Sequence, residues 1–336
     1  MNILFTCAGR RTYLLKYFKE QLAGEGLIVA TDMQLSAPAL QVADVKLQVP
    51  RVYADDYVDI TLDICKKYDI KLLFCLNDLE LPILAENKHR FEEVGTTVVV
   101  SDKNVIDIAF DKYATAQWIE SLGLSSPKTY VTLDAAKEAL ASKEISFPLF
   151  LKPRWGSGSI GLETVEDIEE LEIVYGLLMK KVKKTILATA SVGDEYILIQ
   201  EKLPGKEFGL DVMNDLQGNH VAVSVKQKLA MRSGETDKAV TMDLPVVKEM
   251  GKKIGENLHH IGNLDVDIMQ RENGDYCVLE LNPRFGGGFP FSYEAGVNLP
   301  KALIEWAKGN NVNPEILQPQ YDKMFAKNDY LMEIEH

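Results

Sequence analysis

The sequence predicts an α/β domain followed by an α+β region, and two observations support this fold class. Over the first hundred residues, short apolar runs alternate with amphipathic helical segments, which is the pattern of a parallel sheet with helices on both faces. From about residue 145, apolar runs follow one another with short turns between them, as in an antiparallel sheet. With 336 residues, the chain is long enough for two domains, each with its own core.

The first region predicts a small parallel sheet. The expected elements are strands at 2–9, 27–32, 71–78 and 96–102 and helices at 10–24 and 55–69. Both helical segments repeat apolar residues at helical spacing, whereas the strands are short continuous apolar runs. Since the carboxyl ends of parallel strands share one edge, Gly9, Asp32 and Asp78 should line a crevice there.

The second region predicts a series of strands separated by turn signals. They are expected at 147–153, 195–203, 207–215, 219–231, 264–271 and 275–282. The charged segment 226–240 contains Lys226, Lys228 and Arg232. We interpret it either as an exposed loop or as a loop that grips an anionic group of a substrate.

Composition and charge narrow the class of partner. The chain carries 37 Lys and Arg against 50 Asp and Glu, a net charge of -13, which argues against binding duplex nucleic acid or an anionic membrane. The four cysteines show no C-x-x-C spacing, and neither a signal peptide nor a membrane-spanning run is found. We therefore expect a cytoplasmic protein with small-molecule partners, and a homodimer stays open.

The stretch from Asp275 to Phe289, DYCVLELNPRFGGGF, joins a strand to charged residues and three glycines. The preceding Asn273-Gly274 predicts a two-residue type I′ turn, in which both residues have positive φ. Glu272 would then pair with Asp275, so position 267 would face 280 and position 265 would face 282. Alternation puts Asp265, Asp267, Glu280 and Asn282 on one face, and Val266, Ile268, Leu279 and Leu281 on the other.

Two directly opposed carboxylates repel each other unless a cation lies between them. Carboxylate and amide oxygens are the ligands that Mg²⁺ prefers, so we interpret Asp267, Glu280 and Asn282 as metal ligands and leave the role of Asp265 open. The alternative is a solvated hairpin face. The Asn-Pro-Arg and triple-glycine run directly after the strand favours the metal site.

A Gly- and Ser-rich segment follows the strand that carries Lys152. Residues 156–161 expose backbone N–H groups that can bind a polyphosphate, and the lysine would place an ammonium beside it. The alternative is a flexible loop, but a neighbouring metal site favours phosphate. A break in the strands at 203–205 either offers backbone groups to a purine, with Glu207 near the ribose, or is a plain β-turn.

Arg10 and Arg11 follow the first strand and begin a helix, where an anion can bind. The chain lacks the second and third glycines of G-x-G-x-x-G there, which argues against a nicotinamide oxidoreductase. The two arginines are therefore either weak substrate contacts or surface charges. Asp78, at another strand end, is a third weak substrate candidate.

Taken together, the motifs resemble the ATP-grasp superfamily. Lys112 in FDKYATAQWIESLGLSSPKTY, Lys152 in FPLFLKP, the GSGSIG segment, QEKLPGKE and D-x12-E-x-N-P-R occur in its order. Within this superfamily, the chain resembles a single ATP-binding unit of the carbamoyl-phosphate synthase large subunit. The resemblance implies a pre-ATP-grasp, Rossmann-like domain at 1–105, an ATP-grasp domain at 106–312 (lid-bearing part 106–200, Mg- and phosphate-binding part 201–312) and a tail at 313–336 packed on the core.

The resemblance also implies roles at the nucleotide. Two lysines would contact the ATP phosphates, and residues 156–161 would close over them as a mobile lid. The backbone after residue 200 would hold the adenine, and Glu207 the ribose. The expected ATP-binding residues are Lys112, Lys152, Gly156, Ser157, Gly158, Ser159, Gly161, Glu201, Lys202, Leu203 and Glu207.

The implied function is an ATP-dependent ligase that phosphorylates a carboxylate to an acyl phosphate and joins it to an amine or similar nucleophile. Asp267, Glu280 and Asn282 would hold one or two Mg²⁺ ions, for which Mn²⁺ can substitute. The expected catalytic residues are Lys152, Arg232 and Arg284, and the weak substrate candidates are Arg10, Arg11 and Asp78. The alternatives are the carboxyphosphate or carbamate phosphorylation of carbamoyl-phosphate synthase, and a non-catalytic ATP-binding sensor.

Overall fold

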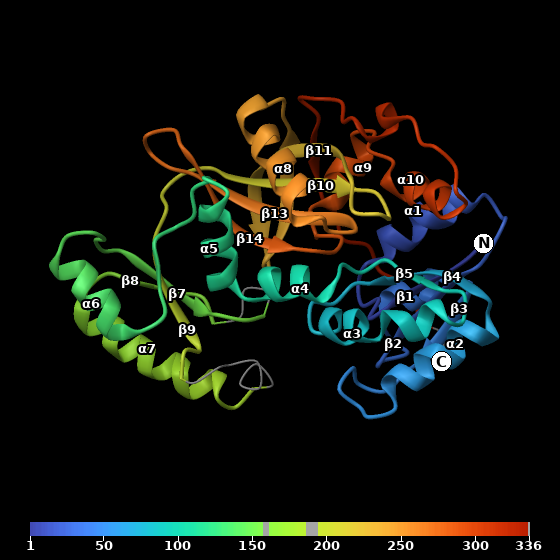
Figure 1. Ribbon diagram of the computed structural model, residues 1–336, viewed down its shortest axis with the longest axis horizontal. Helices are drawn as coiled ribbons and strands as arrows, with labels where there is room; N and C mark the ends of the chain where they lie inside the picture. Colours follow the sequence, from blue (N-terminus) through green and yellow to red (C-terminus); the bar gives the residue numbers. More distant parts are fainter. Residues whose placement is uncertain (157–160, 186–193, 335–336) are drawn as a thin grey trace.

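The computed structural model describes residues 1–156, 161–185 and 194–334. Within these residues the strands form three sheets, of five, six and four strands. The six-stranded sheet lies between the five-stranded sheet on the right of Figure 1 and the four-stranded sheet on the left. A parallel α/β domain followed by two antiparallel sheets is the expected fold class, which is confirmed.

The N-terminal sheet is parallel, in the order β3-β2-β1-β4-β5. Its elements are β1 Asn2–Thr6, α1 Thr12–Leu22, β2 Ile28–Asp32, η1 Pro38–Val42, β3 Val45–Gln48, α2 Tyr57–Lys67, β4 Ile70–Cys75, α3 Leu81–Glu92 and β5 Thr97–Val98. The sequence did not predict β3, because this edge strand mixes polar and apolar residues and buries none of them fully. The strand order reverses between β1 and β4, where a crevice opens at the carboxyl ends of the strands. The segments after these two strands carry Arg11 and Asp78.

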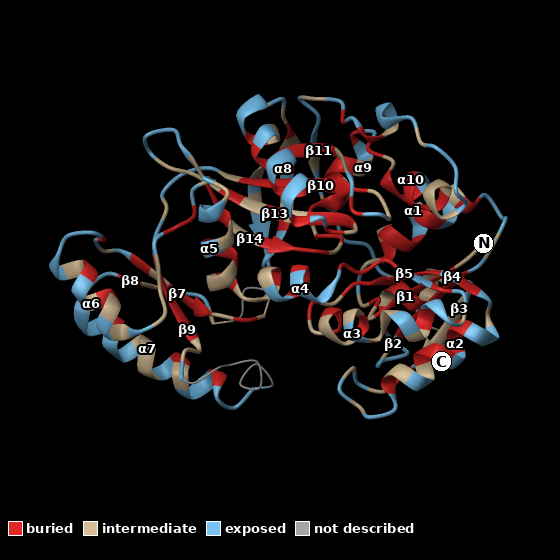
Figure 2. Cartoon of the chain, in the orientation of Figure 1, coloured by how far each residue is buried: buried red, intermediate tan, exposed pale blue. Residues whose placement is uncertain are grey.

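The four-stranded sheet is antiparallel, in the order β6-β9-β7-β8. Helices α4 Lys103–Phe110 and α5 Lys112–Ser121 lead to it from the N-terminal sheet, and its own elements are β6 Thr129–Tyr130, α6 Leu133–Ala141, β7 Leu149–Pro153, β8 Glu163–Val165, α7 Ile168–Val182 and β9 Ile197–Glu201. Helices α6 and α7 share a separate apolar core with β7 and β9. Figure 2 shows that their outer sides are exposed.

The six-stranded sheet has the order β14-β13-β10-β11-β12-β15. Its elements are β10 Glu207–Asn214, β11 His220–Arg232, β12 Glu235–Thr241, α8 Pro245–Leu258, β13 Gly262–Gln270, β14 Tyr276–Asn282 and β15 Met324–Ala326. Helices α4, α5 and α8 cover one face with apolar side chains. The charged segment 226–240, expected as a loop, is instead the end of β11 paired with β12. Both strands belong to the sheet, so the loop interpretation was wrong.

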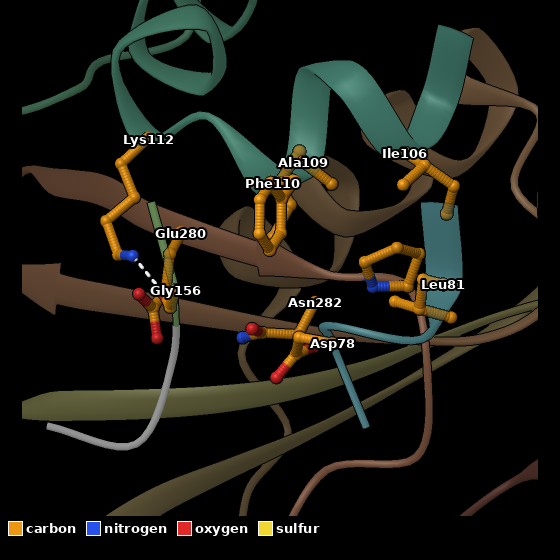
Figure 3. A pocket seen from close by; sticks show the side chains of 11 residues that line it. Asp78, Leu81, Ile106, Ala109, Phe110, Lys112, Gly156, Glu280 and Asn282 are labelled. Carbon is orange, nitrogen blue, oxygen red and sulfur yellow. Dashed lines mark hydrogen bonds between the residues drawn. The ribbon is translucent and has the colours of Figure 1, made fainter. Parts of the chain in front are cut away.

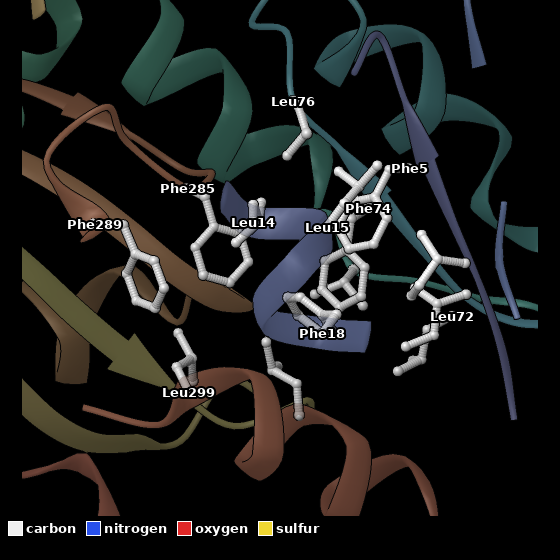
Figure 4. Close-up of a cluster of buried hydrophobic side chains, with 14 of the residues drawn as sticks. Phe5, Leu14, Leu15, Phe18, Leu72, Phe74, Leu76, Phe285, Phe289 and Leu299 are labelled. Carbon is white, nitrogen blue, oxygen red and sulfur yellow. The ribbon is translucent and has the colours of Figure 1, made fainter. Parts of the chain in front are cut away.

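Segments from the two ends of the chain share one apolar core. After β14 come α9 Phe289–Glu294, α10 Leu299–Ala307 and η3 Pro314–Leu317. Figure 4 shows Phe285, Phe289 and Leu299 against α1 and the aromatic side chains of the N-terminal sheet. The ring centroids of Phe18 and Phe285 are 6.0 Å apart. This core fixes the end of β14 against the crevice of the N-terminal sheet.

The β13–β14 hairpin differs from the expected one in two ways. Its loop has three residues, because the N–H of Arg271 donates to the carbonyl of Asp275 at 2.7 Å, and of the expected pair only Gly274 has a positive φ, of 93°. A three-residue loop with a left-handed glycine is the next common hairpin connection. The type I′ prediction and the pairing of Glu272 with Asp275 were therefore wrong.

A β-bulge compensates for the longer loop. The register shifts by one residue between Asp267 and Ile268, which restores the expected pairs of Asp265 with Asn282 and Asp267 with Glu280. The extra residue is Leu279, which lines the cleft described below instead of the core, while the neighbouring Val278 is buried in the core. Bulges re-aim side chains in this way beside functional sites.

Candidate functional site

A cleft of about 780 Å³ lies where the three sheets meet. It collects residues from the ends of the N-terminal strands, from β7 and β9, and from the polar face of the six-stranded sheet. Of the residues singled out in the sequence, it is lined by Arg11, Asp78, Lys112, Lys152, Gly156, Glu201, Lys202, Leu203, Glu207, Asp267, Glu280, Asn282 and Arg284. Ser157, Gly158 and Ser159 lie outside the described residues.

Asp267 and Glu280 face each other on β13 and β14 in the cleft. Burial raises the pKa of Asp267 to about 7, with Lys228 acting to lower it and the neighbouring carboxylates of Asp265 and Glu280 acting to raise it. Burial alone would also raise the pKa of Glu280, but Lys112 and Lys152 hold it below its usual range. The two facing carboxyl groups therefore concentrate negative charge in the cleft. Lys228 lies near Asp267, and Lys112 and Lys152 lie near Glu280.

Lys228 anchors one side of this pair. Its Nζ lies 2.5 Å from an oxygen of Asp267 and 2.7 Å from an oxygen of Glu207. The lysine is on β11 and reaches over β10 to β13, which Gly209 permits, because a Cβ there would lie 3.2 Å from Cε of Lys228. A glycine in mid-strand marks such a close approach.

Asp267, Glu280 and Asn282 are the donors that the sequence predicts for a metal ion. The described part of the chain contains no group of three or more His, Cys, Asp or Glu side chains that could hold a metal by itself. The predicted set has two carboxylates and one amide in register across two strands. Such a partial oxygen set suits Mg²⁺, which keeps water and substrate phosphates among its ligands. The residues therefore fit the ion.

Two lysines approach the carboxylates from the other side of the cleft. Lys152 on β7 is only 6% exposed, and burial lowers its pKa to about 8. Lys112 begins α5 and donates from Nζ to the carbonyl of Gly156 (Figure 3). Asp111, the N-cap residue of α5, forms a two-pronged ion pair with Arg154 beside the same strand. The start of α5 is thus tied to β7.

At the end of the cleft near β9, the walls are apolar side chains and a stretch of backbone between β9 and β10 that belongs to no strand. Phe150, Met269 and Leu279 line it together with Lys202 and Leu203. The Glu201 carboxylate does not point freely into this space, because the Arg271 guanidinium binds it at 2.8 and 2.5 Å and the N–H of Lys128 donates to it. An apolar slot with a few polar groups suits a planar base.

Arg284 follows β14 and joins the two halves of the chain. Its Nε and Nη2 bind the two oxygens of Asp78 at 2.8 and 2.9 Å, and its Nη1 lies 3.6 Å from Asp265. Both side chains are nearly buried. Burial by itself would lower the pKa of Arg284, but Asp78 and Asp265 raise it. An aspartate from the segment after β4 thereby orients the arginine beside the residues predicted to bind a metal.

Several residues singled out in the sequence are not among the described residues that line the cleft, and these include Arg10, Gly161 and Arg232. Arg232 is half-exposed and pairs with Asp237 and Asp329, so the structure does not support a catalytic contact for it. Arg10 is exposed and Gly161 lies beside Pro153 and α7, and neither is among the described residues that line the cleft. Sequence reasoning gave Lys228 no specific place, although its position opposite Glu207 follows from pairing β10 with β11.

None of the helices in the described ranges is long and apolar enough to cross a membrane. Two family models match the chain: "PylC-like, N-terminal domain" at residues 3–99 and "ATP-grasp in the biosynthetic pathway with Ter operon" at residues 194–328. The carbamoyl phosphate synthase large chain of Xanthomonas axonopodis pv. citri (strain 306) is 25% identical over 229 residues, which cover 63% of this chain. The chain spans only 20% of the length of that relative.

Solved structures share the fold at low identity. Biotin carboxylase from Campylobacter jejuni, in complex with β,γ-ATP, superimposes with a TM-score of 0.75 at 17% identity, over 95% of this chain and 73% of its own. The L-amino acid ligase from Bacillus licheniformis gives 0.71 at 18%, over 96% and 78%. N5-Carboxyaminoimidazole synthetase from Staphylococcus aureus complexed with ADP gives 0.70 at 15%, over 93% and 78%. The family models thus identify residues 194–328 as an ATP-grasp domain that follows a PylC-like N-terminal domain at residues 3–99.

Proposed function

We propose that the protein is an ATP-dependent ligase that activates a carboxylate as an acyl phosphate and joins it to an amine. The observation that supports this most is the meeting of Lys112, Lys152, the facing pair Asp267 and Glu280, and Arg284 in one cleft. Phosphoryl transfer is catalysed mainly by positioning and charge neutralisation, which such a set of cations and carboxylates supplies. Among the similar proteins, one is an L-amino acid ligase and another an N5-carboxyaminoimidazole synthetase.

The reaction has two steps. A carboxylate oxygen of the substrate attacks the γ-phosphorus of ATP, the bond from that phosphorus to the β,γ-bridging oxygen breaks, and ADP leaves. The amine nitrogen then attacks the acyl carbon, the carbon–oxygen bond to phosphate breaks, and the nitrogen loses a proton. ADP, phosphate and an amide are the products.

We assign the residues to these steps. Lys112 and Lys152 bind the phosphates, and Arg284, oriented by Asp78, meets the charge of the transferring group. Asp267, Glu280 and Asn282 would hold Mg²⁺, which when bound neutralises phosphate charge. Lys202 and Leu203 hold the adenine through their backbone, and Glu207 the ribose. With these roles we also propose the domain boundaries that the sequence suggests, between residues 105 and 106 and between residues 312 and 313.

Replacing Glu280 by glutamine tests the metal ligands, because it removes a charge and almost no volume. We expect ADP release in the presence of a mixture of carboxylates and amines to fall at least about a hundredfold, since metal ligands act directly on the reacting phosphate. Glu272→Gln, on the exposed loop of the same hairpin, is the matched control and should keep wild-type turnover. Undiminished ADP release by a folded Glu280→Gln protein contradicts the assignment. Absence of ADP release from wild type with every carboxylate favours the ATP-binding sensor.

A further inference from the structure

The cleft continues past Arg284 into a part that the nucleotide and metal do not account for. We call it the far end and define it by Arg11, Glu235, Thr236, Gly287 and Gly288, all of which line the cleft. Arg11 comes from the start of α1, whereas Glu235 begins β12 on the six-stranded sheet. The far end therefore lies between the N-terminal sheet and the six-stranded sheet.

Arg11 brings a positive charge to the far end. Its guanidinium is partly buried and donates from Nη1 to the backbone carbonyl of Phe285 at 2.5 Å. A carbonyl fixes the position of a guanidinium without neutralising it. No carboxylate in the described part of the chain forms an ion pair with Arg11. A guanidinium that is held by a carbonyl and lies near Glu235 without pairing with it is suited to bind a carboxylate.

Glu235 brings a negative charge to the same space. One of its oxygens, Oε2, accepts from Nζ of Lys327 at 3.0 Å. Burial would raise the pKa of Glu235, but Lys327, Arg11 and Arg10 hold it below its usual range. The carboxylate is therefore charged at neutral pH. Lys327 belongs to the segment directly after β15, and its ammonium shows that the Glu235 carboxylate accepts such a group in this geometry.

The glycine run lies between these two charges. The carbonyl of Phe285 holds Arg11, and a Cβ on Gly287 would lie 3.1 Å from Cδ of Glu235. The hydroxyl of Tyr13 donates to the carbonyl of Gly286 at 3.4 Å and lies in the field of both Arg11 and Glu235. A larger residue at Gly287 would crowd Glu235, so the glycine keeps this carboxylate accessible beside the backbone.

We propose that the far end binds a free amino acid as a zwitterion, with its carboxylate between Arg11 and Arg284 and its ammonium on Glu235, in the place that Lys327 takes here. The proposal deepens the proposed function, on which it rests for the fate of the bound carboxylate. Binding itself does not depend on that function. A single charged partner would fit many ligands, but a cation and an anion on either side of one backbone segment select a molecule with both charges.

The test measures binding without turnover. The thermal midpoint of the full chain is recorded with Mg²⁺ and the non-hydrolysable analogue AMP-PNP, after adding each common L-amino acid or the corresponding acid without the amino group. We expect at least one amino acid to raise the midpoint and its deaminated partner to have no effect. Titration of that amino acid should show affinity falling about tenfold to hundredfold in Glu235→Gln, the loss of one charge-assisted hydrogen bond.

A matched variant separates ligand binding from a structural ion pair. Lys327→Met removes the same ion pair as Glu235→Gln but leaves the carboxylate in the cleft, so it should bind the amino acid at least as well as wild type. Equal losses of affinity in the two variants, an equal response to deaminated acids, or no response to any amino acid would each overturn the zwitterion site. ADP release is assayed in parallel: stabilisation by an amino acid without ADP release refutes the ligase while leaving the site, and ADP release with deaminated acids refutes the site while leaving the ligase.

Discussion

Lys226 and Lys228 lie two residues apart on β11 and point to the same face of the six-stranded sheet, yet their surroundings differ. Lys226 is fully buried, with its Nζ 2.6 Å from the equally buried Asp211 and 3.4 Å from Ser292. Lys228 is at the cleft and holds Glu207 and Asp267, which remain partly exposed. Lys226 thus belongs to the packed interior, whereas Lys228 belongs to the candidate site. The two lysines differ in whether their partners line the cleft.

The glycine run strengthens this contrast. A Cβ on Gly288 would lie 2.7 Å from Cε of Lys226, and a Cβ on Gly286 would lie within 2.4 Å of the Asp265 carboxylate. The backbone after β14 therefore covers Lys226, whereas Lys228 lines the cleft. What seals the first lysine is the close approach that only glycine allows.

The largest effect is expected from breaking the sealed pair. Lys226→Met leaves the Asp211 carboxylate buried without its counter-ion, which costs about 3–5 kcal/mol of unfolding free energy. Urea unfolding measures it. The double variant Lys226→Met/Asp211→Leu removes both charges and should recover most of that loss. A single variant as stable as wild type would show that the pair is not sealed from water.

Lys228→Met should act on turnover more than on stability. Without the ammonium, Asp267 and Glu207 lose the group that fixes them in the cleft, and we expect ADP release to fall about tenfold to hundredfold, or about 1.4–2.7 kcal/mol in transition-state free energy. The urea midpoint should move less than in Lys226→Met, because water reaches both carboxylates. If the two variants lose equal stability and Lys228→Met keeps full turnover, the contrast between the two lysines is wrong.

A third buried base, His260, sharpens the comparison because no described carboxylate forms an ion pair with it. Its Nε2 contacts the carbonyl of Val212 at 3.0 Å, and burial lowers its pKa from 6.5 to about 3. Between these values the unfolded chain binds more protons than the folded one, so unfolding free energy falls as pH falls below 6.5. The slope is about 1.4 kcal/mol per pH unit, or about 2 kcal/mol down to pH 5.

His260→Gln should flatten that dependence, which urea unfolding at pH 5, 6 and 7 measures. The pKa of His220 is also lowered, by burial, so the informative quantity is the difference between wild type and variant. An unchanged slope would mean that the His260 ring has the same pKa in the folded and unfolded chain.

The smallest effect is expected at Arg232, the last residue of β11, which also carries Lys226 and Lys228. It lies outside the cleft in exposed ion pairs, which contribute little to stability. Arg232→Ala should leave ADP release at the wild-type rate. A fall comparable to that of Lys228→Met would restore Arg232 to the catalytic set that the sequence suggested.

The hairpin shows how far local sequence rules reach. Alternation and a turn signal were enough to pair Asp267 with Glu280, but the loop was one residue longer than expected and a bulge restored the register. Neither change has a local signal: the bulge places Leu279 in the cleft and Val278 in the core. Packing against α5 and the cleft decides between them, and that information is not in the strand itself.

Contacts between distant segments were beyond the sequence. The family motif predicted Arg284 and the strand end predicted Asp78, but nothing local indicated that the two bind each other across 206 residues. The same holds for Arg271 on Glu201. The ion pairs of long charged side chains depend on how the sheets pack against one another. A single sequence therefore predicts which residue types lie at a site more readily than which of them pair.

The shared core of Figure 4 determines which parts of this chain could be exchanged between proteins. The four-stranded sheet keeps its apolar residues to itself, with α6 and α7, and is in this respect a portable module. The N-terminal sheet is not, because Leu14 and Phe18 of α1 lie against residues from beyond β14. Cutting after residue 105 would expose those side chains, each worth about 1.5–3 kcal/mol when buried. Recombination or circular permutation should therefore keep the four-stranded sheet with α6 and α7 intact and carry the first and last segments of the chain together.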